Sequence, residues 1–276
     1  MAFIEKLRAA QVANRSYVCV GLDPDVTKMP PTLGQSGSDM LDFCNAIVDT
    51  TADVVSAYKA NLAFFLAHGA VGIDVLRQVI AHVPPEIPTI LDAKFGDIGN
   101  TAEHYADFAY SHLQVDAVTV SPYVGTEAIV PFIKPSEKLA FVLCRTSNTQ
   151  GNEFQAWPDS ESPLYRRVTQ EVITLGETYP HQLGLVVGAT QPDELAQVRV
   201  WASYLPFLIP GLGAQGGDLA AAVQNGVTRD GVGPVINTGR AVLYASQGSD
   251  FAQAARERVV ALRDEINALR LSDYAR

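Results

Sequence analysis

The stretch PTILDAKFGDIGNT (residues 88–101) contains a strand pattern that runs directly into a cluster of charges. Its first residues are apolar or β-branched, which is typical of a buried strand, and Asp92 and Lys94 follow where that run ends. Side chains two residues apart lie on the same face of a strand, so we predict that these two charges are neighbours. Burying charge without a partner is prohibitive, and the pair must therefore close on itself or face a polar site.

Similar apolar runs recur on both sides of this stretch, separated by segments with helical spacing. Continuously apolar strands are buried on both faces, as parallel sheets require. We see no linker rich in Gly, Ser or Pro and no internal repeat, so we expect one domain over residues 1–276, an α/β (β/α)8 TIM barrel rather than a doubly wound sheet. The predicted strands are residues 17–23, 54–62, 88–94, 115–122, 139–147, 183–190, 206–213 and 233–239.

Composition excludes several classes of function. The chain has 276 residues, with 20 Lys and Arg against 30 Asp and Glu, and its formal net charge of −10 argues against nucleic-acid or anionic membrane partners. The three cysteines are widely spaced, without a disulfide or zinc pattern. No apolar run is long enough to span a membrane, and the first residues lack the apolar core of a secretory signal. We expect a cytoplasmic protein, which can still bind an anionic small molecule.

Polar side chains follow most of the predicted strands, at the end where barrel enzymes carry their chemistry. They are Asp23, Lys59, Asn61, Asp92, Lys94, Ser147, Gln215 and Arg240. Lys59 comes from the strand next to that of Asp92 and Lys94, and a structural ion pair alone does not explain why it reaches the same rim. Flanking carboxylates would keep the Lys94 side chain charged, which suits a proton donor better than a free-amine nucleophile.

A second cluster consists of the glycine-rich PGLGAQGG (residues 210–217) and NTGR (residues 237–240). Glycine-rich turns after the seventh and eighth strands of a barrel commonly bind a phosphate through backbone N–H groups. Arg240 can add a bidentate, charge-assisted contact. We therefore predict a phosphate site there.

Taken together, these motifs resemble the orotidine 5'-phosphate decarboxylase family, in its longer bacterial subgroup. The resemblance rests on DAKFGDIGNT (residues 92–101), GLDPD (21–25), YKANLAFF (58–65), GLGAQGG (211–217) and TGR (238–240). It implies a barrel enzyme that forms UMP and CO2 from orotidine 5'-phosphate without a cofactor or metal, as a homodimer with shared active sites.

The resemblance also implies roles for individual residues. Asp92, Lys94 and Asp97 match the catalytic Asp-Lys-Asp, with Asp97 and Thr101 reaching the partner subunit's site, and Lys59 resembles the lysine that binds ribose and the first aspartate. The remaining matches imply contacts with the substrate: Asp23 and Asn61 with the sugar, Ser147 with the pyrimidine edge, and Gln215, Gly239 and Arg240 with the phosphate.

Two features depart from the shorter members of the family. FVLCRTSN (residues 141–148) replaces their methionine-serine version, and residues 148–160 form a longer polar segment, which we interpret as a lid or an interface. Two other functions stay open on the residues alone. One is a magnesium-dependent aldolase or decarboxylase acting on a sugar phosphate, and the other is a catalytically silent phosphate-binding barrel.

Overall fold

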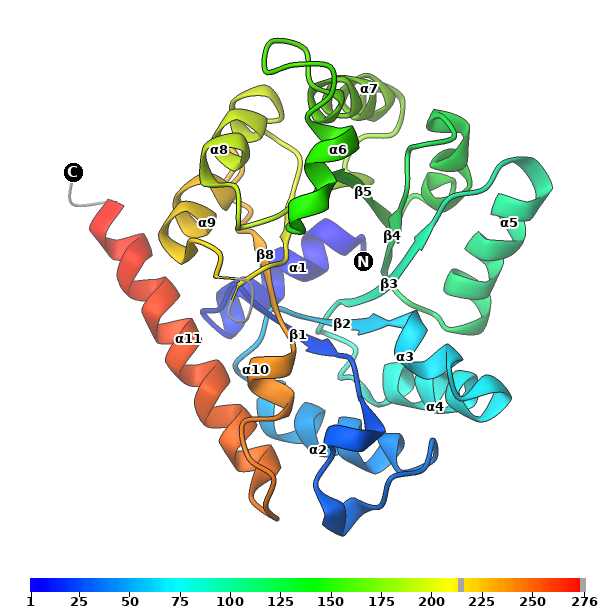
Figure 1. Cartoon of the computed structure of the whole chain (residues 1–276), viewed down its shortest axis with the longest axis vertical. Helices are drawn as coiled ribbons and strands as arrows, with labels where there is room; N and C mark the ends of the chain where they lie inside the picture. Colours follow the sequence, from blue (N-terminus) through cyan, green and yellow to red (C-terminus); the bar gives the residue numbers. More distant parts are fainter. Residues whose placement is uncertain (213–215, 274–276) are drawn as a thin grey trace.

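Eight parallel strands close into a barrel in the computed structural model, which describes residues 1–212 and 216–273 (Figure 1). Each strand pairs with the next along the chain, and β1 pairs with β8. The strands are β1 Val18–Leu22, β2 Ala57–Asn61, β3 Thr89–Phe95, β4 Ala117–Val120, β5 Leu139–Arg145, β6 Leu183–Val187, β7 Phe207–Ile209 and β8 Val235–Thr238. The predicted (β/α)8 fold is confirmed.

Most strands are shorter than the runs predicted for them. Val54 and Val55, for example, are buried but precede β2, which begins at Ala57. An apolar run in the sequence indicates that its residues are buried, and residues just outside the hydrogen-bonded part of a strand are buried as well. The pattern therefore located each strand correctly and overestimated the length of most of them, with β3 as an exception at seven residues in both cases.

Helices surround the strands, and in the view of Figure 1 α11 runs along one side of the molecule. They are α1 Phe3–Ala13, α2 Met40–Thr51, α3 Leu62–Leu66, α4 Gly69–His82, α5 Gly99–Asp107, α6 Asn152–Gln155, α7 Leu164–Thr178, α8 Pro192–Trp201, α9 Leu219–Gly226, α10 Arg240–Leu243 and α11 Phe251–Asp273. Between β4 and β5 stand two 3-10 turns, Thr126–Ala128 and Val130–Ile133. Within the described residues, no helix is long and apolar enough to cross a membrane.

The barrel interior is apolar at its amino-terminal end. Cys19, Ala57 and Ile90 belong to this inner cluster, together with Phe3 and Leu7 of α1. The ring of Phe3 meets that of Phe141 edge to face, with the centroids 5.7 Å apart. Helix α1 thus closes the bottom of the barrel.

Two residues further along the strands, the inward side chains become polar. On four strands the change is direct: Ala57 is followed by Lys59, Ile90 by Asp92, Ala117 by Thr119 and Val235 by Asn237. Because side chains alternate with a period of two, these residues stand directly above the apolar layer. The polar residues therefore gather at the carboxyl-terminal mouth of the barrel.

Candidate active site

Asp92 is the centre of the polar layer. Its Oδ2 accepts a hydrogen bond from Lys59 Nζ at 3.1 Å, and its Oδ1 accepts from Lys94 Nζ at 2.5 Å and from Thr119 Oγ1 at 3.0 Å. Lys59 Nζ also lies 3.5 Å from Asp23 Oδ1. The structure thus joins Asp23, Lys59, Asp92 and Lys94 in one network, as the strand-end pattern predicted for neighbouring strands.

The charges of this network stabilise one another. Burial would lower the pKa of Lys59, which is 4% exposed, but Asp23 and Asp92 outweigh that effect and raise it above its ordinary value. Burial would likewise raise the pKa of Asp92, yet Lys59 and Lys94 bring it down to about 2. Both groups therefore stay charged at neutral pH.

The main chain at Lys94 adopts an unusual conformation. Its φ is 52°, in the left-handed region, and the pairing of β3 with β4 shifts register between Leu91 and Phe95. The Lys94 N–H donates to Thr119 Oγ1 at 2.9 Å, and the same hydroxyl donates to Asp92. A non-glycine residue here costs roughly 1–2 kcal/mol, and such strain is typical of functional sites. The geometry leaves the Lys94 side chain 48% exposed at the mouth, in contrast to buried Lys59.

A cavity of about 290 Å³ opens over this network. Asp23, Lys59, Asp92 and Lys94 line one part of it. Leu143, Val186 and Leu208 supply an apolar wall, and Thr146, Ser147 and Asn148 line it from the end of β5. Charged groups beside an apolar wall suit a flat, partly polar ring.

A second cavity of about 180 Å³ adjoins the first and shares Asp23, Ser147, Pro210 and Asn237 with it. Gly239 and Arg240, which the sequence analysis placed in the predicted phosphate site, line this second cavity. Ser147 is held in place because Thr190 Oγ1 donates to its carbonyl at 2.9 Å. At Gly188, a Cβ would approach Ser147 N to 2.7 Å, so the next strand also packs tightly against it. The two cavities form one continuous cleft.

Other predicted residues lie elsewhere. The Asn61 side chain accepts from Ala63 N at 3.1 Å, which caps α3, and it does not line either cavity. Asp97 accepts from Ile98 N at 2.8 Å, and both it and exposed Thr101 are outside the cleft. Gln215 lies outside the described residues.

Two cleft residues were missed by sequence reasoning. Thr119 orients both Asp92 and Lys94, but threonine is common in strands and gave no signal. Asn237 lines both cavities, and its buried Oδ1 has no hydrogen-bond partner within the described chain. The sequence did contain a signal for Asn237: it belongs to the NTGR motif and comes two residues after Val235, whose side chain points into the barrel. A buried oxygen without a donor marks a point where a ligand can bind.

Comparison with known proteins identifies a family for the chain. The family model described as "Orotidine 5'-phosphate decarboxylase / HUMPS family" matches residues 16–257. An orotidine 5'-phosphate decarboxylase of Ralstonia pickettii is 48% identical over 273 residues, which are 98% of this chain and 100% of that protein.

Solved structures give the same result. The Leishmania donovani OMP decarboxylase superposes with a TM-score of 0.85 at 38% identity, over 98% of this chain and all of that one. The UMP synthase of the same organism gives a TM-score of 0.84 at 40% identity, and this chain spans 57% of its length.

Proposed function

The chain belongs to the orotidine 5'-phosphate decarboxylase / HUMPS family, and from that premise we propose that it converts orotidine 5'-phosphate to UMP and CO2 with Lys94 as the acid. It is a carboxy-lyase of pyrimidine nucleotide synthesis. The observation that carries the role of Lys94 is its ammonium, held by Asp92 at 2.5 Å and open to the larger cavity.

In the proposed reaction, the bond between C6 of the pyrimidine and the carboxylate carbon breaks, and its electron pair stays on C6. The Lys94 ammonium stabilises that charge and then transfers a proton to C6. Two unit charges ~4 Å apart attract by about 4 kcal/mol at an effective dielectric of 20. Asp92 holds Lys94 in place, and Lys59 and Thr119 hold Asp92.

The rest of the nucleotide would occupy the cleft from end to end. We place the pyrimidine ring against the apolar wall of the larger cavity and the phosphate in the smaller one, beside Gly239 and Arg240. Asp23 lines both cavities and stands where the ribose would join them. Phosphate contacts remote from the reacting carbon supply binding energy that positions the ring.

We further propose that the enzyme is a homodimer with shared sites. Asp97 and Thr101 lie outside their own cleft, although the resemblance gives them roles in catalysis. Apolar side chains are exposed on the same and on the following loop: Ile98, next to Asp97 in the sequence, is 47% exposed, and Tyr123, after the neighbouring strand β4, is 80% exposed. A second copy packed over this surface would bury those side chains and receive Asp97 into its own site. The proposal treats residues 1–276 as one domain. It also places the enzyme in the cytoplasm, because the three cysteines are buried and unpaired, as is usual in a reducing compartment.

The test is the loss of the orotate absorbance when purified protein meets orotidine 5'-phosphate in excess EDTA. Rapid loss, with UMP as product, is the expected result. Turnover that needs added magnesium would instead favour the metal-dependent sugar-phosphate chemistry. A folded protein that binds UMP and turns over nothing would favour the silent phosphate-binding barrel.

A further inference from the structure

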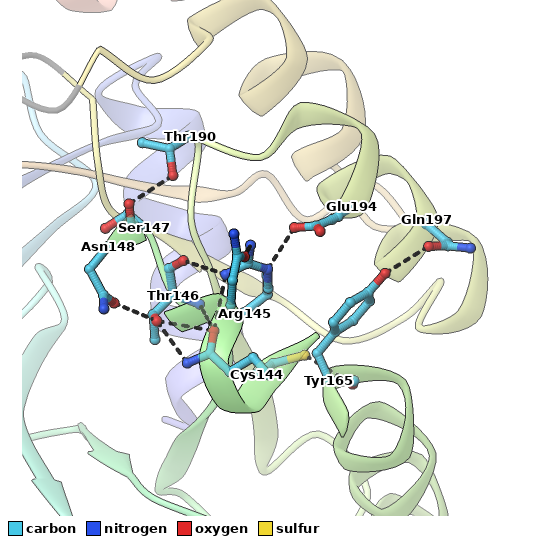
Figure 2. A network of polar contacts seen from close by, with 11 residues as sticks. Cys144, Arg145, Thr146, Ser147, Asn148, Tyr165, Thr190, Glu194 and Gln197 are labelled. Atoms are coloured by element: carbon cyan, nitrogen blue, oxygen red, sulfur yellow. Dashed lines mark hydrogen bonds and ion pairs between the residues drawn. The ribbon is translucent and has the colours of Figure 1, made fainter. Parts of the chain in front are cut away.

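The segment after β5 is fixed to the barrel by a buried arginine. Arg145 is 0% exposed, and its Nε donates to Glu194 Oε2 of α8 at 2.6 Å (Figure 2). Its two terminal nitrogens donate to Asn152 Oδ1 and, at 3.2 Å, to Gln155 Oε1, both on α6. A buried guanidinium that loses a partner costs several kcal/mol, so these bonds are held firmly. Helix α6 is therefore tied to the end of β5 and to α8 through Arg145.

Gln155 connects this anchor to the rim of the cleft. Its Oε1 accepts from the Thr146 N–H at 2.8 Å, and its Nε2 donates to Thr146 Oγ1 at 2.8 Å. The turn just before α6 also approaches closely, because a Cβ at Gly151 would lie 2.9 Å from Thr146 Oγ1. In the view of Figure 1, α6 lies between α7 and the centre of the barrel.

The direction of the Thr146 hydroxyl follows from counting lone pairs. The hydroxyl has two acceptors within reach, Gln155 Oε1 at 3.1 Å and Asn148 Oδ1 at 2.7 Å. Gln155 Oε1 also accepts from Arg145 and from the Thr146 N–H, which supplies one donor for each lone pair of a carbonyl oxygen, so the shorter contact with Asn148 is the favoured one. The Thr146 hydroxyl hydrogen is then directed to Asn148 Oδ1, at 2.7 Å (Figure 2). Because that oxygen faces Thr146, the NH2 group is the part of the Asn148 side chain that remains to donate to a ligand. Within residues 1–212 and 216–273, that group has no hydrogen-bond partner, and Asn148 lines the larger cavity.

We propose that Asn148 is a specificity-determining residue whose NH2 group donates to a carbonyl oxygen of the substrate's pyrimidine ring, and that Gln155 is the positioning residue that orients it through Thr146. This inference rests on the proposed function, which supplies a ring bearing carbonyl oxygens. It gives residues 148–160 a role at the base end of the cleft. A ligand without the ring would make no use of the relay.

The experiment compares two ligands by isothermal titration calorimetry: UMP, which has the ring, and ribose 5-phosphate, which has only the sugar and phosphate. The variants are Asn148→Ala, Gln155→Ala and the double variant. The matched control is Gln197→Ala, because exposed Gln197 accepts from the Tyr165 hydroxyl at the far side of the same network. Melting temperatures check that each variant is folded.

Each single variant would lose one hydrogen bond to the ring. We therefore expect UMP binding to weaken by about three- to tenfold and ribose 5-phosphate binding to stay unchanged. The double variant should be no worse than the weaker single one, because both remove the same contact. Unchanged UMP binding in Asn148→Ala, or equal weakening of both ligands, would overturn the proposal. Additive effects in the double variant would remove Gln155 from its positioning role.

Wild-type turnover of orotidine 5'-phosphate, measured separately, tests the proposed function. If the wild type turns over the substrate and Asn148→Ala binds UMP as tightly, the inference fails alone. If the wild type does not turn it over, the proposed function fails first. Asn148 is exposed, so its variant keeps the test decisive even if Gln155→Ala does not fold.

Discussion

Two replacements of Lys94 can distinguish the catalytic role proposed for its side chain from the strain of its left-handed backbone. We expect Lys94→Ala and Lys94→Gly to lose the same catalytic group. General acid catalysis contributes about 10²–10⁴-fold, and losing an ammonium ~4 Å from the developing charge adds a few kcal/mol, so turnover should fall by at least a thousandfold in both. UMP binding should change little, because Asp23, Ser147 and Arg240 still line the cleft.

The two variants should differ in stability, and in an unusual order. Glycine is ordinarily worse than alanine in a strand because its unfolded chain is more flexible, by about 0.4–1 kcal/mol. At φ 52°, however, alanine keeps a strain of about 1–2 kcal/mol that glycine removes. The difference predicts that Lys94→Gly is more stable than Lys94→Ala by about 0.5–1 kcal/mol, or roughly 2 °C in Tm for a chain of this size.

The assays are initial rates from the orotate absorbance, calorimetric titration with UMP, and thermal unfolding of both variants side by side. Activity of Lys94→Ala within tenfold of the wild type would show that Lys94 is not the acid. A Lys94→Gly variant less stable than Lys94→Ala would refute the strain argument, whatever the rates show.

Further predictions concern the phosphate, the dimer and pH. Arg240→Ala should raise KM about 10- to 100-fold in initial-rate assays with little change in kcat, since it removes charge-assisted hydrogen bonds; an unchanged KM would exclude it from the phosphate site. Mixing Lys94→Ala and Asp97→Ala subunits under exchanging conditions should restore about a quarter of wild-type activity, because half the dimers are hybrids with one intact site; no recovery contradicts shared sites. Because the pKa of Asp92 falls from 3.8 to about 2 on folding, its charge contributes about 2 kcal/mol above pH ~4 that is lost as pH falls toward 2. Thermal unfolding from pH 7 to 2.5 should therefore show a steeper loss of Tm in the wild type than in Asp92→Asn, and equal slopes would contradict this.

The barrel and most of the cleft were predictable because one physical rule governs both. Strands buried on two faces give apolar runs, and their carboxyl ends meet at one mouth, so polar residues that end such runs must converge. Lys59, Asp92 and Lys94 are brought together for this reason. The same rule placed Gly239 and Arg240 at the second cavity.

Other features depended on contacts that no local pattern encodes. The left-handed backbone of Lys94 arises with the register shift between β3 and β4 and is held by Thr119, a residue from the neighbouring strand. Arg145 continues β5 in sequence, yet the pairing of β5 with β6 shifts register there and the side chain binds α6 and α8. Each register shift changes the direction of one side chain near the carboxyl end of its strand. The regular alternation of inward and outward side chains does not predict such a change.

In the network around Asp92, only Lys94 needs to change its charge during the proposed reaction. Asp92 Oδ2 is held by buried Lys59 and its Oδ1 by Thr119, so its carboxylate keeps two hydrogen bonds when Lys94 gives up a proton in the proposed reaction. Lys59 lines the cavity but is only 4% exposed, whereas the Lys94 side chain is 48% exposed. In the proposed reaction, water that enters after product release therefore reaches Lys94 more readily than Lys59 and returns the proton there. In the proposed reaction the two lysines on one carboxylate thus have different roles: Lys59 fixes the charge of Asp92, and Lys94 would transfer the proton.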